Sequence, residues 1–450
     1  MIEMKPRLSV VALFVSLALA ACGEEKKGAS PGGPGGWSGG GAGGGSSGAD
    51  GGAGGVSPGP GGSGGAGGEG GGKGGAGGAG GEGGGKGGTG GAGGDGGGDS
   101  GAGGAGGGSE DPTCPPGVVC EGTYNYAFYS SMSMNPDEFG GLRGGDEICE
   151  ELAEASSLPS GRYIAWLSDS TTDAKDRLGD ASGWLRPDGR PFAASQADLL
   201  SENILYPISM DENGEMLASW EVGFTGTDKK GERTTHHCDD WTSREISKLY
   251  YGGSPHAGGG GWSQDSSGPC TTARRLICLQ IDHQNRVPEV SIAGRWAFVT
   301  SSPFPVAGGI AAADELCATE ASSQGLGGSF KALLATSTTS AIARFSLDGD
   351  TWVRMDGLPI WESARDAAEI PPLAPILFHP DGSAPLKMLS IWIGAPSLHE
   401  TGTETCNDWT SSDSEKQGIL GYSAYANEGW IQRAPSACQR EDVHLICLEE

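Results

Sequence analysis

The sequence predicts an α+β fold that is repeated twice after a long glycine-rich segment. Three observations lead to this prediction. Of the 86 glycines, 51 lie between Gly23 and Gly108. Behind this segment, eight cysteines form two sets with nearly identical spacing, and short motifs recur at an offset near 168 residues. Each copy combines one early amphipathic helix with several short strands, which is typical of α+β domains.

The N-terminus has the pattern of an export signal. Lys5 and Arg7 precede an apolar run over 8–21, which is too short to span a bilayer as a stable helix. The run ends in Leu-Ala-Ala-Cys22, which resembles the lipobox of bacterial lipoproteins. That resemblance implies a signal peptide over 1–21 and acyl chains on Cys22 that anchor the chain in a membrane. Gly23 then favours the outer membrane or cell surface. The alternative is an ordinary secretory signal cleaved before an incidental cysteine.

Residues 22–113 are expected to form a disordered tether. A segment so rich in glycine cannot bury enough apolar surface to offset its chain entropy. It is not a collagen repeat, because its Gly-Gly-x steps from Gly64 onward contain no proline and slip in register. A flexible chain of about 90 residues spans roughly 50–55 Å on average. The segment therefore suits display of the following domains away from a membrane.

The charge excludes one class of partner. The formal net charge is -28. The first 22 residues contribute +1 and residues 23–113 contribute -5, which leaves -24 on the remainder. Because such an acidic surface repels phosphate backbones, we expect no nucleic-acid partner.

The cysteines define the repeat. Apart from Cys22, ten remain, and an even number in an exported chain favours disulfide bonds over metal or thiol chemistry. Cys114 and Cys120 are expected to close a small loop. The other eight fall into two sets with spacings of 89, 32 and 8 and of 89, 32 and 9: Cys149, Cys238, Cys270, Cys278, and Cys317, Cys406, Cys438, Cys447. Each set allows three pairings, and spacing does not choose among them.

Other residues keep the same offset and set the expected domain bounds. They place a first domain at 124–281 and a second at 294–450, joined by a short polar linker over 282–293. The matched pairs are Trp184 with Trp352, Trp220 with Trp392, Asp240-Trp241 with Asp408-Trp409, and Trp262 with Trp430.

Within each copy the same elements are expected in the same order. They are a first strand (126–129; 296–300), an amphipathic helix (146–156; 312–322), a second strand (163–167; 330–334), an Asp-Gly hairpin signal (188–189; 356–357) and a last strand (275–280; 444–448).

Several motifs of both copies resemble endostatin, the C-terminal domain of certain vertebrate collagens, and a bacterial lipoprotein family built from that domain. The segments that carry the resemblance are 141–146 leading into Cys149, 161–168, 224–228, 238–242 and 270–279. The resemblance implies two tandem C-type-lectin-like domains. It also implies nested disulfides: Cys149–Cys278 with Cys238–Cys270, and Cys317–Cys447 with Cys406–Cys438.

The resemblance also guides the search for a site. The histidines that bind zinc in endostatin have no counterpart in the glycine tether, and His236-His237 is replaced by Glu404-Thr405 in the second copy, so no metal site is expected. Calcium-dependent lectins of this fold use a Trp-Asn-Asp triplet and a second carboxylate-bearing triplet. The matching segment 262–265 keeps a tryptophan and one carboxylate, which makes Trp262, Asp265 and Trp430 the candidate ligand-binding residues. The Asp240-Trp241 and Asp408-Trp409 pairs are expected to be structural.

Catalysis finds no support in the sequence. No serine or cysteine lies in a recognisable nucleophile motif, the cysteines are expected in disulfides, and no cofactor is implied. We therefore expect a membrane-anchored, extracytoplasmic lipoprotein that displays two lectin-like domains for a glycan or protein ligand. The alternatives are a structural envelope protein without a small ligand and an enzyme on a lectin-like fold. The sequence makes no prediction of oligomeric state.

Overall fold

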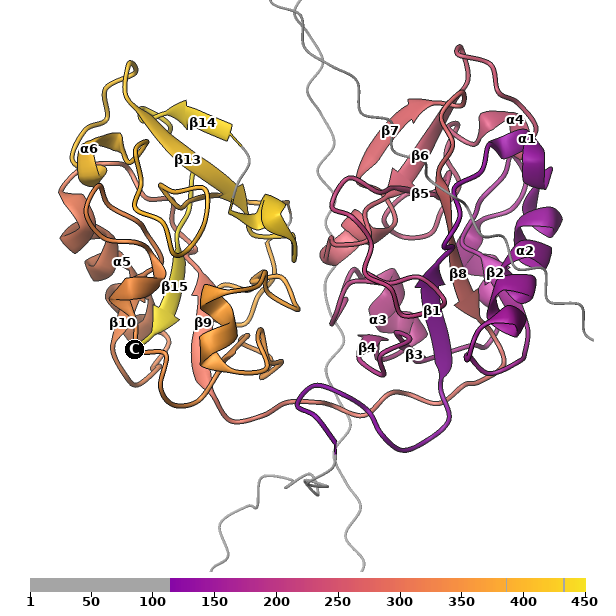
Figure 1. The fold of residues 1–450 in the computed structure, drawn as a ribbon, viewed down its shortest axis with the longest axis horizontal. Coiled ribbons are helices and arrows are strands. Elements are labelled where there is room, and N and C mark those ends of the chain that lie inside the picture. Colours follow the sequence, from indigo (N-terminus) through magenta and orange to yellow (C-terminus); the bar gives the residue numbers. More distant parts are fainter. Residues whose placement is uncertain (1–113, 386, 432–433) are drawn as a thin grey trace, which may run out of the picture. The chain divides into compact units, whose positions relative to one another are not determined.

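The computed structural model describes residues 114–450 except Leu386, Gln432 and Arg433. Cys22, the signal segment and the glycine-rich segment lie outside the described residues. The described chain combines helices with several sheets (Figure 1), which confirms the mixed class predicted from the sequence. We refer to residues 124–281 and 294–450 as the first and second repeat.

The first repeat is built on one large sheet. Its strands and α-helices are β1 (Asn125–Tyr129), α1 (Pro136–Phe139), α2 (Leu142–Ala155), β2 (Tyr163–Ala165), β3 (Trp184–Leu185), β4 (Pro191–Ala193), α3 (Gln196–Leu200), β5 (Gly223–Phe224), α4 (Cys238–Trp241), β6 (Leu249–Gly253), β7 (Ser266–Pro269) and β8 (Arg275–Gln280). Two 3-10 helices are η1 (Ala174–Leu178) and η2 (Gly259–Trp262). The strand order is β4-β3-β1-β8-β5-β6-β7, and β2 also pairs with β8.

The second repeat follows the same order of elements in two smaller sheets, with three exceptions. Its elements are β9 (Arg295–Val299), α5 (Gly309–Ser323), β10 (Phe330–Ala332), η3 (Ile342–Arg344), β11 (Trp352–Val353), η4 (Ala364–Ala368), β12 (Ser390–Trp392), α6 (Cys406–Trp409), β13 (Gln417–Tyr422), η5 (Glu428–Trp430), β14 (Ala434–Ala437) and β15 (Ile446–Glu449). Here η4 replaces α3, and the described residues of this repeat contain no element that matches α1 or β4. One sheet has the order β10-β15-β9-β11 and the other β12-β13-β14. The division arises because β5 pairs with β8, whereas only a single bridge, Ile391 to His444, replaces that pairing here.

The first and last strands of each repeat pair in equivalent register. In the first repeat β1 and β8 are antiparallel, with Phe128 opposite Cys278, and Figure 1 shows the two strands side by side. In the second repeat β9 and β15 are antiparallel, with Phe298 opposite Cys447. In each repeat the first and last strands therefore lie side by side in the middle of a sheet. A disulfide links the early helix, α2 or α5, to the last strand.

The early helix begins sooner than its apolar pattern predicts. We expected it over 146–156, but α2 begins at Leu142 and includes Gly144 and Gly145. A Cβ on Gly144 would lie 1.7 Å from the carbonyl oxygen of Phe139, and one on Gly145 would lie 3.1 Å from Ala165. The glycines are thus required for close packing of the helix rather than for a turn before it.

Ten cysteines form five disulfides in the described chain, as predicted for an exported protein. Cys114 pairs with Cys120. The other pairs are nested, as the resemblance implies: Cys149–Cys278, Cys238–Cys270, Cys317–Cys447 and Cys406–Cys438. Because the outer bridges close loops of 129 and 130 residues, each stabilises its repeat by on the order of 4–5 kcal/mol in the chain-entropy model.

The repeated Asp-Trp pairs lie in a short left-handed turn. All four residues of α4 and all four of α6 have φ between 50° and 66°. The turn buries Trp241 and Trp409, whose indole nitrogens donate to the carbonyls of Ser168 and Ala335, both at 2.8 Å. Its aspartates, Asp240 and Asp408, accept hydrogen bonds from the backbone and hydroxyl of a serine in the preceding loop. The pairs are structural, as expected.

One predicted match between the repeats is wrong. Trp220 was matched to Trp392, but Trp392 lies in β12, which pairs with β13 as β5 pairs with β6. The register makes Phe224 the counterpart of Trp392, and both side chains are buried. Trp220 instead lies outside the strands and is 78% exposed.

Candidate functional site

The two repeats contact each other through a short backbone bridge. Ala257 of the first repeat and Tyr425 of the second form an isolated antiparallel bridge. On either side of it, the N–H of Gly258 donates to Ala424 and the N–H of Ala426 donates to His256, both at 2.9 Å. The bridge matters because a cavity opens beside it.

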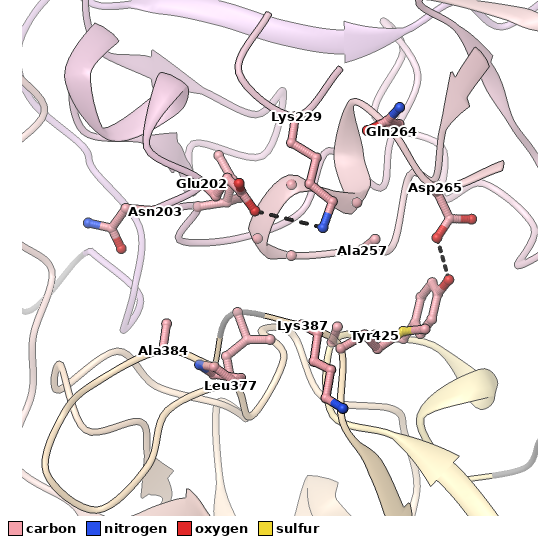
Figure 2. Close-up of a pocket in the computed structure, with 18 of the residues that line it drawn as sticks. Glu202, Asn203, Lys229, Ala257, Gln264, Asp265, Leu377, Ala384, Lys387 and Tyr425 are labelled. Carbon is pink, nitrogen blue, oxygen red and sulfur yellow. Dashed lines mark hydrogen bonds and ion pairs between the residues drawn. The ribbon is translucent and has the colours of Figure 1, made fainter. Parts of the chain in front are cut away.

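That cavity, which we call the cleft, has a volume of about 610 Å³ and takes its walls from both repeats. In Figure 2, Glu202, Lys229 and Gln264 of the first repeat face Leu377 and Ala384 of the second. The size is within the range of small-molecule sites. The cleft is therefore the candidate functional site.

The charges that line the cleft are balanced. Glu202 lies 4.0 Å from the ammonium of Lys229, and Asp265 accepts a hydrogen bond from the hydroxyl of Tyr425 at 2.5 Å (Figure 2). Lys387 supplies a second cation from the other repeat. Two carboxylates and two ammonium groups among the described lining residues give no net charge, so the cleft does not select an ion by charge alone.

A run of four glycines forms one wall of the cleft. Gly258 precedes η2 and the next three glycines form its first residues; Gly259 has a φ of +58°, which favours glycine. A Cβ on Gly260 would lie 2.6 Å from the side chain of Lys229 and 2.7 Å from a carboxylate oxygen of Glu202. A larger residue at this position would therefore displace the two charged groups.

The chemistry of this lining suits a polar, uncharged ligand. Carboxylate, amide and ammonium groups of Glu202, Asn203, Lys229, Gln264 and Asp265 supply both donors and acceptors. No group of three or more His, Cys, Asp or Glu suited to a metal lies within the described residues. The arrangement can bind hydroxyl and amide groups.

Two of the three predicted ligand-binding residues are buried in the core. Trp262 is 1% exposed and packs against Trp166 and Phe192, with ring centroids 5.0 Å apart in both cases. Trp430 is 2% exposed and packs against Trp361. Neither indole offers a surface to a ligand, because the 3-10 helix that carries each one turns the ring into the core. The expectation for these two tryptophans is therefore corrected.

Asp265 is the one candidate that reaches a cavity. It lies just beyond η2, lines the cleft and is held by Tyr425 of the other repeat. Sequence reasoning missed Glu202, Lys229 and Tyr425, since they come from separated segments. The available signal was the run of four glycines beside Trp262, which is unusual in a domain with an otherwise ordinary glycine content.

The histidine pair next to Cys238 has a local structural role. His237 accepts a hydrogen bond from the N–H of Asp240 at 3.0 Å and so caps the left-handed turn, while the ring of His236 lies 4.4 Å from that of Tyr251. Thr405 makes the equivalent bond to Asp408 at 3.1 Å in the second repeat. The position requires a side-chain acceptor rather than a metal ligand.

The comparisons with known proteins identify no relative. No family model matches the chain, and no curated protein matches it. Across residues 114–450, apart from the three that are not described, no helix has both the length and the apolar composition needed to cross a membrane.

Proposed function

We propose that this protein is a membrane-anchored, extracytoplasmic bacterial lipoprotein that binds an uncharged glycan in the cleft between its repeats and has no catalytic role. The observation that carries the proposal is the cleft itself. It combines a charge-balanced polar lining with a wall of four glycines, Gly258–Gly261, two of which are partly exposed. Both features suit a ligand whose surface is mainly hydroxyl groups.

We further propose that the repeats are tandem C-type-lectin-like domains related to endostatin. Three features support this: the nested disulfides, the pairing of the first and last strands, and an early helix bridged to the last strand. Because a fold hosts many functions, the assignment supports a binding role without naming the ligand.

The lining favours a sugar over the other polar ligands that fit this volume. A nucleotide or phosphosugar would need an excess of positive charge, but the two ammonium groups of the lining, Lys229 and Lys387, are balanced by two carboxylates. A saccharide has many hydroxyl groups, each able to donate and accept, and these match the mixed donors and acceptors of Asn203, Gln264 and Asp265. The acidic charge of the chain also disfavours acidic polysaccharides.

The glycan proposal is tested on an array that carries neutral and acidic glycans, probed with the full chain in lipid nanodiscs. We expect binding to neutral glycans, weakened about tenfold in Lys229→Ala, because that substitution removes a donor and leaves Glu202 without its ion pair. Lys230→Ala is the control, since this neighbouring side chain is exposed and does not line the cleft. Equal loss in both variants, or binding to acidic glycans only, would contradict the proposal. Silence on the array with ordered self-association would favour a structural envelope protein.

The anchor is tested separately by metabolic labelling with a fatty acid. We expect label on the full chain and none on Cys22→Ala, which should also leave the membrane fraction, because Cys22 ends the lipobox-like motif. Label that persists in the variant would exclude Cys22 as the lipid site. An accessibility assay on intact cells then decides whether the chain faces the periplasm or the outside.

A further inference from the structure

A second cavity, of about 570 Å³, lies beside the same bridge. Ala257 and Tyr425 line the cleft, whereas their neighbours His256 and Ala426 line this second cavity. The bridge therefore stands between the two. We call the second one the Trp220 cavity, after its most exposed side chain.

Large exposed apolar side chains gather at the Trp220 cavity. Trp220 is 78% exposed, Met216 59% and Ile370 47%, and all three line it. They are three of the seven large hydrophobic side chains that the described residues leave exposed. Trp220 and Met216 come from the first repeat and Ile370 from the second, so the cavity has apolar walls on both sides. Such concentrations of exposed apolar surface mark interaction sites.

The cavity also has polar side chains that are incompletely hydrogen-bonded. Arg186 and Arg190, both buried, share the carboxylate of Asp188 at 2.6 and 2.7 Å. Within the described chain, Nε of Arg190 and Nδ1 of His256 are buried without a hydrogen-bond partner. Burial lowers the pKa of His256, so its ring is neutral at pH 7, with Nε2 2.9 Å from the carbonyl of Leu217. One donor and one acceptor therefore remain unmatched.

We infer that the Trp220 cavity binds a polypeptide segment of a protein partner, which inserts an aliphatic or aromatic side chain between Trp220 and Ile370. Tryptophan, methionine and arginine are the residues most enriched at the centres of protein interfaces, and the cavity contains all three. A large apolar side chain placed between Trp220 and Ile370 would bury apolar surface on both walls of the cavity.

The apolar walls disfavour a sugar at this place. A sugar ring could stack on Trp220, but the apolar side chains of Met216, Ile370 and Leu373 in the same lining offer no hydrogen bond to its hydroxyl groups. Charge does not select a ligand either, because Arg186 and Arg190 are balanced by Asp188 and by Glu362, which pairs with Arg190. The Trp220 cavity thus differs in chemistry from the cleft, and the inference is independent of glycan binding.

The test uses random hexapeptides displayed on phage and selected against the full chain in lipid nanodiscs. We expect enrichment of peptides with a large apolar residue, and selected peptides that bind Trp220→Ala at least about tenfold more weakly by calorimetry. Ile370→Ser, in the opposite wall, should weaken them to a similar degree. Ile246→Ala is the matched control, because Ile246 is 76% exposed but does not line the cavity.

Three results would overturn the inference. The first is that no peptide is enriched, or that the selected peptides bind Trp220→Ala as tightly as they bind the wild-type chain. The second is loss of glycan binding in Trp220→Ala, which would make the cavity part of the glycan site. The third is self-association of the wild-type chain that Trp220→Ala abolishes, which would assign the surface to a second copy of the chain. Because Trp220 is mostly exposed, the variant should fold, and unchanged circular dichroism verifies this.

Discussion

The guanidinium of Arg354, in the second repeat, donates a hydrogen bond at 3.2 Å to the carbonyl of Leu205, 149 positions earlier in the first repeat. Arg354 is fully buried, forms two hydrogen bonds to Asp356 and lies 4.9 Å from the ring centroid of Phe378. Its counterpart Arg186 binds Asp188 in the same way but donates to Pro207 of its own repeat. Arg354 thus contacts the other repeat, whereas its counterpart Arg186 bonds within its own repeat.

Replacing Arg354 should lower the free energy of unfolding. Arg354→Met leaves the half-buried Asp356 without its cation and the Leu205 carbonyl without this donor. We expect the free energy of unfolding, measured by urea titration, to fall by about 3 kcal/mol. Arg440→Met is the matched control, because Arg440 makes the same pair with Asp442 near the surface. It should cost under about 1 kcal/mol. Equal losses would show that burial of Arg354 is not the source of the effect.

Acidic pH should remove the contribution of Asp356 to the stability of the fold. Burial raises the pKa of this carboxyl, but the Arg354 guanidinium outweighs burial and holds the pKa below its usual value. Stability from this group is therefore full above the unfolded pKa of about 3.9 and is lost as the pH falls through the lower folded pKa. The gap in unfolding free energy between wild type and Asp356→Asn should be largest near neutral pH and should narrow below about pH 4. A gap that stays constant down to about pH 2 would refute the linkage, and Asp348→Asn, at an exposed carboxyl, serves as the control.

The left-handed turn should reverse the usual preference between alanine and glycine. Asn407 is exposed, with φ 55° and ψ 56°, a conformation in which a Cβ costs roughly 1–2 kcal/mol. Asn407→Gly should therefore be more stable than Asn407→Ala by about 1 kcal/mol, as measured by thermal unfolding. At Glu150, exposed within α2, the order should be the ordinary one, with alanine more stable than glycine by about 1 kcal/mol. The same order at both positions would argue against the left-handed geometry.

Much of the fold could be predicted because it depends on local pattern and on the repeat. The early helix and the first and last strands appear in both repeats close to where the sequence places them. The differences are the later start of β15 at Ile446, the earlier start of α5 at Gly309 and the earlier start of α2 at Leu142. The difference at α2 has a physical reason, since Gly144 and Gly145 lie at a packing contact with Phe139 and Ala165 that no local pattern reveals. The left-handed geometry of Cys238–Trp241 also escaped prediction, because such a run is intrinsically unfavourable and persists only where tertiary contacts hold it.

Most of the candidate site could not be predicted from the sequence. Trp262 and Trp430 are candidates because they lie where calcium-dependent lectins of the resembled fold carry a Trp-Asn-Asp triplet. A tryptophan at this position can equally fill a core, and both do so. Of the three candidates only Asp265 lines a cavity, where it meets Tyr425, 160 positions away. Glu202 and Lys229 come from separate segments of the first repeat and Lys387 from the second, so the set depends on the fold of the first repeat and on how the repeats contact each other.

The sequence by itself determined the repeated order of elements and the cysteines available for bridges, because spacing and periodicity are properties of the chain. Only the tertiary structure decided which tryptophans are buried and which one is exposed, since helices and turns of similar sequence point side chains in different directions. It also decided where cavities form. The cleft and the Trp220 cavity take their walls from both repeats, beside the bridge between Ala257 and Tyr425. No segment of the chain contains enough of either cavity to reveal it.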